Sequence, residues 1–95
     1  MITVTSALCV WNGEKGSWHF LTVPADQAVE IRLATISPRT GFGSVRVEAA
    51  IGDVRWRTSI FPQKEGGYLL PVKADVRRRT EIRPGDEVTF TLDLV

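Results

Sequence analysis

Residues 44–58 place the strongest constraint on the fold, because apolar and polar side chains alternate on both sides of Gly52-Asp53. A two-residue period is typical of β-strands with one face in the core. Glycine followed by another residue suits a two-residue type II′ turn. The resulting hairpin would pair, on its core-facing side, Ile51 with Val54, Ala49 with Trp56 and Val47 with Thr58. The outer side would pair Ala50 with Arg55 and Glu48 with Arg57, so both faces are consistent with one register.

The rest of the chain shows similar patterns. Alternation, or runs of aromatic and β-branched residues, predict further strands over residues 2–10, 17–23, 68–70 and 88–94. Turns or loops are expected at residues 12–16, 37–43, 61–67 and 84–86. Pro24 and Pro71 each end a strand and suit a helix start. We therefore expect short helices at residues 25–33, with Ala25, Val29 and Leu33 on one face, and at about residues 72–81.

About six strands and two short helices in 95 residues predict one domain, residues 1–95. The fold class is mostly β, and the architecture is a small closed barrel with mostly antiparallel strands. A faint internal repeat supports closure, because strand, proline, helix and alternating strand follow one another twice, at Val23-Pro24 and at Leu70-Pro71. Two related halves within one chain would close the barrel, and a monomer is then expected.

The chain has one cysteine and one histidine, Cys9 and His19. An intrachain disulfide and a zinc site built from such ligands are thereby excluded. Cys9 is interpreted as a small packed hydrophobe, with a reactive thiol as the alternative. His19 is interpreted as a packed or hydrogen-bonded residue, with a general base as the alternative. No nucleophile elbow, phosphate-binding glycine loop, EF-hand or paired-carboxylate motif occurs. We expect a non-enzyme with no catalytic residue, no metal site and no cofactor.

Localisation and global charge are also constrained. The first residues show no signal peptide, and no apolar stretch is long enough to span a membrane. Without a disulfide or an export signal, a cytoplasmic protein is expected. Twelve Lys and Arg against eleven Asp and Glu give a net charge of +1, which provides no global attraction to nucleic acid or anionic lipid.

A basic segment over residues 72–83 is the main candidate binding site, and its cations are Lys73, Arg77, Arg78, Arg79 and Arg83. Asp75 precedes Arg79 by four residues, and Glu81 follows Arg77 by four, which is the spacing of intrahelical ion pairs. One interpretation is a solvated helix with ordinary pairs. The alternative is an anion or phosphate-backbone site, whose affinity would fall steeply with salt.

Three further groups of residues stand out: the arginines of the predicted hairpin, the tryptophans and Gly85-Asp86. Arg46, Arg55 and Arg57 lie on the outer face of the predicted hairpin, where a cross-strand pair of Arg57 with Glu48 explains part of the charge. Whether this group and the basic helix form one surface is left open. Three tryptophans, Trp11, Trp18 and Trp56, are interpreted as core residues, with Trp56 facing inward. A ligand-stacking platform is the alternative. Gly85-Asp86 is interpreted as a turn with a carboxylate that caps backbone N–H groups.

The second half resembles the AbrB-like motif of swapped-hairpin barrels. The residues that carry the resemblance are Leu70-Pro71, Arg77-Arg78, Ile82, Gly85-Asp86 and the alternation from Val88. In that motif a proline starts the helix and Gly-Asp turns the chain into the final strand. The chain departs from it by a proline-to-glycine spacing about two residues longer and by Thr80-Glu81 in place of Leu-Gly.

The whole chain is similar to a small family known only as a domain of unknown function. The matching segments are Trp18-His19-Phe20 with Pro24, Gly43-Ser44-Val45, Trp56-Arg57-Thr58-Ser59, Tyr68 to Lys73, Val76-Arg77 and Gly85-Asp86. The resemblance implies an AbrB-related double-split β-barrel that occurs alone or fused to a YdeI/OmpD-associated segment. It implies no activity.

Two functions follow as hypotheses. The first is a non-catalytic binding module whose partner is another protein or a fused segment. The second is nucleic-acid or anionic-ligand binding through the basic helix at residues 72–83. The small net charge and the departures from the AbrB-like motif place the second after the first.

Overall fold

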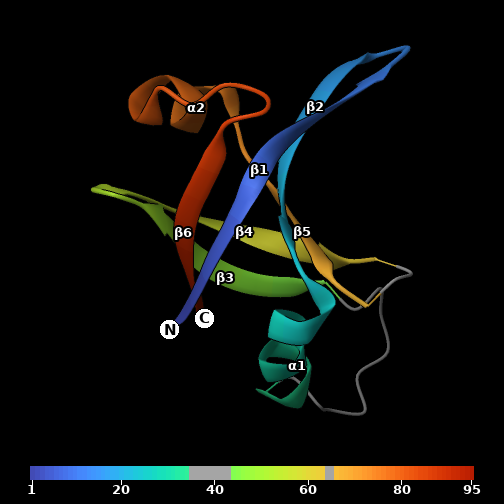
Figure 1. The fold of residues 1–95 in the computed structure, drawn as a ribbon, viewed down its shortest axis with the longest axis vertical. Coiled ribbons are helices and arrows are strands. Elements are labelled where there is room, and N and C mark those ends of the chain that lie inside the picture. Colours follow the sequence, from blue (N-terminus) through green and yellow to red (C-terminus); the bar gives the residue numbers. More distant parts are fainter. Residues whose placement is uncertain (35–43, 64–65) are drawn as a thin grey trace.

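The computed structural model describes residues 1–34, 44–63 and 66–95, which form a closed antiparallel barrel with two helices (Figure 1). The elements are β1 (Ile2–Gly13), β2 (Gly16–Val23), α1 (Ala25–Ala34), β3 (Val45–Ile51), β4 (Val54–Pro62), β5 (Tyr68–Pro71), α2 (Ala74–Thr80) and β6 (Glu87–Leu94). Around the barrel the strands follow the order β1-β2-β5-β4-β3-β6. The predicted mostly β barrel with two helices is confirmed.

The hairpin β3–β4 has the register that the alternation predicts, from Ile51 opposite Val54 to Val47 opposite Thr58. Gly52 has a φ of 58°, whereas Asp53 has a negative φ, as a type II′ turn requires. Val47 and Ala49 are fully buried, and Trp56 is half-buried against the core as predicted.

The two halves of the chain are related by the topology of the barrel. Exchanging β1 with β4, β2 with β5 and β3 with β6 leaves the order of strands around the barrel unchanged. Each half also contains a strand, a proline, a short helix and a strand in that order. The internal repeat seen in the sequence therefore corresponds to two similarly arranged halves, and the barrel closes within one chain.

The interior of the barrel is filled with side chains. All buried residues in the described part of the chain are apolar, and the largest include Phe90, Leu8, Leu21, Ile60 and Leu92. Burial of one such side chain contributes about 1.5–3 kcal/mol to stability. No polar or charged residue is fully buried in the described part of the chain, so the barrel interior offers a ligand few specific polar contacts.

α1 buries a different face from the one predicted, and α2 is shorter than predicted. In α1, Ala28 and Ile31 are buried while Val29 is exposed, so the predicted apolar face was wrong. α2 is shorter than residues 72–81, because the N–H of Val72 still pairs with the carbonyl of His19 at 2.9 Å and Lys73 is extended. Glu81, with a φ of 55°, ends α2 in the left-handed conformation.

Three strand boundaries also differ from those predicted. β4 continues through Phe61 and Pro62, since Phe61 pairs with Leu69, so the loop begins later than residue 61. β5 likewise extends to Pro71, which pairs with Phe20. The turn after the first strand narrows to Glu14-Lys15, because Gly13 pairs with Gly16. The predicted loop at residues 37–43 lies outside the described residues.

The hairpin β1–β2 extends beyond the barrel. β1 pairs with β6 from Ile2 to Ala7, and Leu8 bonds to the backbone of Gly85 and Asp86 just before β6. From Cys9 to Gly13, β1 pairs with β2 alone among the described residues. β2 reaches its second neighbour, β5, only from Phe20 onward. Residues 9–20, called the arm below, therefore project from one end of the barrel, on the same end as α2 (Figure 1).

Candidate functional site

Cys9 and His19 lie on opposite faces of the arm. Cys9 is opposite Phe20, whereas His19 is opposite Val10, and neighbouring positions along a strand point to opposite faces. A catalytic Cys–His pair is therefore excluded by the register. Cys9 is exposed, so its interpretation as a packed hydrophobe was wrong. The reason is that the arm has no second layer over the face that carries Cys9.

His19 lies on the face of the arm that meets α2. An Nη1 group of Arg77 donates to Nε2 of His19 at 3.2 Å. Nε2 must carry a lone pair to accept this bond, which places the proton of the neutral ring on Nδ1. Burial and the positive charge of Arg77 together lower the pKa of His19 below its ordinary value of 6.5. The expectation of a hydrogen-bonded histidine is confirmed, with a cation as its partner.

The five cations of residues 72–83 do not form one uniform face. Arg78 and Arg79 both pair with Asp75, at 3.5 Å and 3.7 Å. The expected pair of Arg77 with Glu81 was wrong, because the guanidinium of Arg77 reaches across to His19. Lys73 and Arg83 have no carboxylate partner within the described part of the chain.

Three of these cations meet at a hollow on the surface of about 410 Å³, between α2 and the start of the turn that follows it. The hollow is lined by Ala74, Arg77, Arg78, Glu81, Ile82 and Arg83. The turn itself is fixed by Asp86, whose carboxylate accepts the N–H of Arg83 at 2.8 Å, so the predicted capping role of Asp86 is confirmed. Neither Lys73 nor Arg79 lines this hollow.

Trp11 and Trp18 lie directly opposite each other on the outer face of the arm. They are 60% and 61% exposed, so their interpretation as core residues was wrong. The ring of Trp11 lies over Gly13, where an added Cβ would stand 3.2 Å from the indole. The absence of a side chain at Gly13 thus leaves room for the six-membered part of the indole of Trp11. The glycines that flank the turn, Gly13 and Gly16, are the sequence signal for this arrangement.

The apolar outer face continues from the arm onto the barrel. Phe20 is opposite Pro71 in β5, and Leu69, two residues before Pro71, is opposite Phe61 in β4. Phe61 is exposed, and the other three are half-buried. We call this surface the aromatic face and define it as Cys9, Trp11, Trp18, Phe20, Phe61, Leu69 and Pro71. A contiguous exposed apolar surface of this kind is uncommon on monomeric proteins and marks interaction sites.

Two of the three arginines of β3 and β4 form ion pairs with a neighbouring glutamate. Glu48 pairs with Arg55 at 3.6 Å and with Arg57 at 3.7 Å, which confirms the predicted cross-strand charge pair. Arg46 has no carboxylate partner among the described residues.

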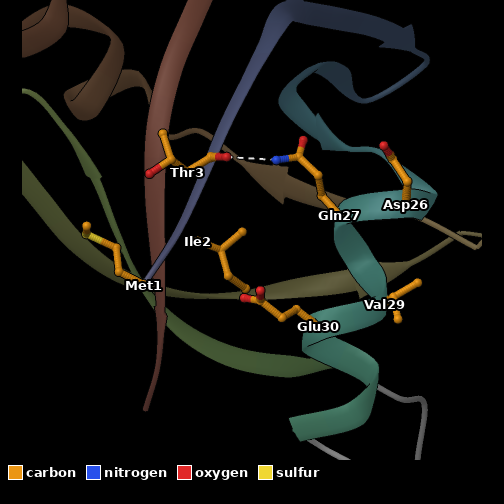
Figure 2. A pocket seen from close by; sticks show the side chains of 7 residues that line it. All are labelled: Met1, Ile2, Thr3, Asp26, Gln27, Val29 and Glu30. Carbon is orange, nitrogen blue, oxygen red and sulfur yellow. Dashed lines mark hydrogen bonds between the residues drawn. The ribbon is translucent and has the colours of Figure 1, made fainter.

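A second hollow of about 450 Å³ lies between α1 and the beginning of β1 (Figure 2). Gln27 crosses it and donates to the carbonyl of Thr3 at 2.8 Å. Figure 2 shows Glu30 extending toward β1, whereas Val29 points away. Gln27 thus joins the helix to the strand, and the residues that line this hollow do not include a set of nucleophile, acid and base.

The described ranges contain neither a candidate metal site nor a membrane-spanning helix. No group of three or more Cys, His, Asp or Glu side chains there is placed to hold a metal ion. No helix among them is long and apolar enough to cross a membrane.

Comparison with known proteins gives a family and no activity. The family model described as "Domain of unknown function (DUF1905)" matches residues 5–92. No curated protein matches the chain.

Proposed function

The chain belongs to the DUF1905 family, whose description names no activity, and from the geometry we propose that it is a non-catalytic module that binds another protein through the aromatic face. The observation that carries this proposal is the pair of opposed, largely exposed tryptophans on an arm that lies outside the barrel. Interfaces between proteins are enriched in Trp, Phe and Tyr, which provide large contact areas with few rotatable bonds.

The edges of the arm support the same function. Among the described residues, each strand of the arm pairs only with the other one between Cys9 and His19, apart from the bond from Val72 at its base. An unpaired strand edge offers N–H and C=O groups to an extended segment of a partner. An extended segment added to this edge would lie beside the indoles, so main-chain bonds and apolar contacts would act together.

The partner that we propose is a protein segment carried by a fused or a separate chain. The resemblance to barrels that occur fused to a YdeI/OmpD-associated segment favours this choice. We also propose that the barrel is an AbrB-related double-split barrel and that the protein is a cytoplasmic monomer. The unchanged strand order on exchange of the two halves supports the relationship, and closure within one chain supports the monomer.

Site-specific photocrosslinking tests the binding surface. A photoreactive phenylalanine analogue in place of Trp11 or Trp18 is expected to give one discrete heavier species in cells, and Phe20→Ala in the same chain should reduce it. The matched control carries the analogue at Asp53, an exposed turn residue of the other hairpin. The same products from Trp11, Trp18 and Asp53 would contradict the proposal. So would metal-free turnover of a substrate that is lost in His19→Ala.

A second function, nucleic-acid or anionic-ligand binding through residues 72–83, is favoured by the hollow that Arg77, Arg78 and Arg83 share. Fluorescence anisotropy with labelled duplex and single-stranded DNA tests it, at low and at physiological salt. Binding that survives physiological salt, and that weakens with a flatter salt slope in Arg77→Ala/Arg78→Ala, is the expected result for this function. Absence of binding at low salt would rule out nucleic acid.

A further inference from the structure

The hollow beside α2 has a geometry that suits a small anion. Ala74, Arg77, Arg78 and Glu81 follow one another at spacings of three, one and three residues, which places them on one side of the helix. Ala74 leaves space at one end of this row, and Ile82 and Arg83 close the other. Arg77 and Arg78 from the helix and Arg83 from the following turn thus line the same hollow.

The guanidinium of Arg77 is the central feature, because its charge is not balanced. Arg77 is half-buried, and within the described part of the chain its guanidinium has the neutral ring of His19 as its hydrogen-bonded partner. Its Nε atom is buried and has no hydrogen-bond acceptor. No carboxylate of the described residues pairs with it. A partly buried cation without a counter-charge is unfavourable, so an anion that reaches it stabilises the folded state.

The other charges around the hollow leave it positive. Arg78 pairs with Asp75, which also pairs with Arg79. The carboxylate of Asp86 is bonded to the backbone of Arg83, which leaves the guanidinium of Arg83 without an acid among the described residues. Glu81 is the one acidic residue that lines the hollow. Arg77 and Arg83 have no carboxylate partner among the described residues, so these two charges favour a ligand that carries two negative charges on a compact group.

We propose that Arg77, Arg78 and Arg83 form a binding site for the phosphoryl group of a small phosphate monoester. Guanidinium groups match the oxygens of a phosphoryl group through paired N–H donors, and such charge-assisted bonds are the strong ones. The site lies on α2, whereas the aromatic face lies on the other side of the arm from His19, so one chain would have two separate binding surfaces. This inference narrows the second proposed function to one ligand chemistry and does not depend on the first.

NMR titration of the ¹⁵N-labelled full chain with inorganic phosphate tests the site, with glycerol phosphate as a monoester and chloride as the control for ionic strength. Saturable shifts of the amides at residues 74–83 are expected with both phosphate probes. Arg83→Gln, which alters an exposed side chain, should weaken binding about tenfold, which corresponds to ~1.4 kcal/mol. Arg77→Gln should weaken phosphate binding by at least as much as Arg83→Gln.

The matched control is Arg79→Gln, which removes the same charge from the same helix at a position outside the hollow. It should change the affinity for phosphate less than twofold. If Arg79→Gln and Arg83→Gln weakened phosphate binding equally, the loss would reflect the net charge of the helix and not a specific site, and the proposal would be overturned. Shifts with chloride equal to those with phosphate would also overturn it. Binding of DNA without binding of either phosphate probe would refute this site while retaining the nucleic-acid function.

Discussion

The hairpins β1–β2 and β3–β4 have similar alternating sequences, yet they differ in how much of their length is barrel wall. β3 pairs with β4 on one side and with β6 on the other from Val47 to Ala50, so its inward side chains are covered. The arm lacks such a neighbour between Cys9 and His19. Alternation thus predicts which side chains share a face, while burial of that face depends on a further strand or helix.

The largest expected loss of stability comes from a substitution at the base of the hairpin β1–β2. Leu21→Ala removes a fully buried side chain opposite Leu8 and should lower the free energy of unfolding by about 2–5 kcal/mol. Trp18→Ala, three residues away, should cost less than ~1 kcal/mol, the range of exposed cross-strand pairs. Urea denaturation followed by circular dichroism measures both. A cost for Trp18→Ala as large as that for Leu21→Ala would mean that the arm is packed in solution.

The turns of the two hairpins provide the next contrast. Gly52→Ala places a Cβ on a residue with a φ of 58° and should cost about 1–2 kcal/mol, although nothing blocks the added atom. Gly13 has no positive φ, and its added Cβ would only push the ring of Trp11 aside. Gly13→Ala should therefore change the tryptophan fluorescence with little loss of stability. Unchanged fluorescence would show that Trp11 does not rest on Gly13.

The inner face of the arm can be tested through His19. Because the pKa of His19 is lowered in the folded chain, the unfolded chain binds a proton first as the pH falls through about 6.5. The free energy of unfolding should therefore fall as the pH decreases below that value. Arg77→Gln should raise the pKa of His19 while leaving it below 6.5, because burial is the larger cause. NMR titration of the imidazole carbons measures this, and an unchanged pKa would argue against the contact with Arg77.

The smallest effect is expected on the outer face of β3–β4. Glu48→Gln removes the carboxylate between Arg55 and Arg57, and exposed pairs of this kind contribute about 0.2–1 kcal/mol at most. The difference from the unaltered chain should shrink at high salt. A larger, salt-independent loss in urea denaturation would show that Glu48 has a packing role beyond its charge.

Several features of the candidate site follow from local sequence patterns. The pair of Asp75 with Arg79 and the cap formed by Asp86 involve residues three or four apart, whose relative positions a helix or turn fixes. The contact of Arg77 with His19 joins residues 58 positions apart, and no local pattern contains it. Arg77 instead has Glu81 at pair spacing, and the local rule therefore predicted the wrong partner. The hollow likewise depends on the turn that brings Arg83 back beside α2.

Local sequence patterns are sufficient to predict the presence of the strands, the register of β3–β4, the start of α1 after Pro24 and the repeat of two halves, whereas α2 begins only three residues after Pro71. These features depend on backbone geometry and on side-chain period, which act over a few residues. Only the tertiary structure decided that Trp11, Trp18 and Cys9 are exposed and that Arg77 meets His19. Solvent exposure and long-range contacts depend on which elements pack across a given face. Among the described residues no strand or helix packs over the outer side of the arm, so the aromatic face lies open.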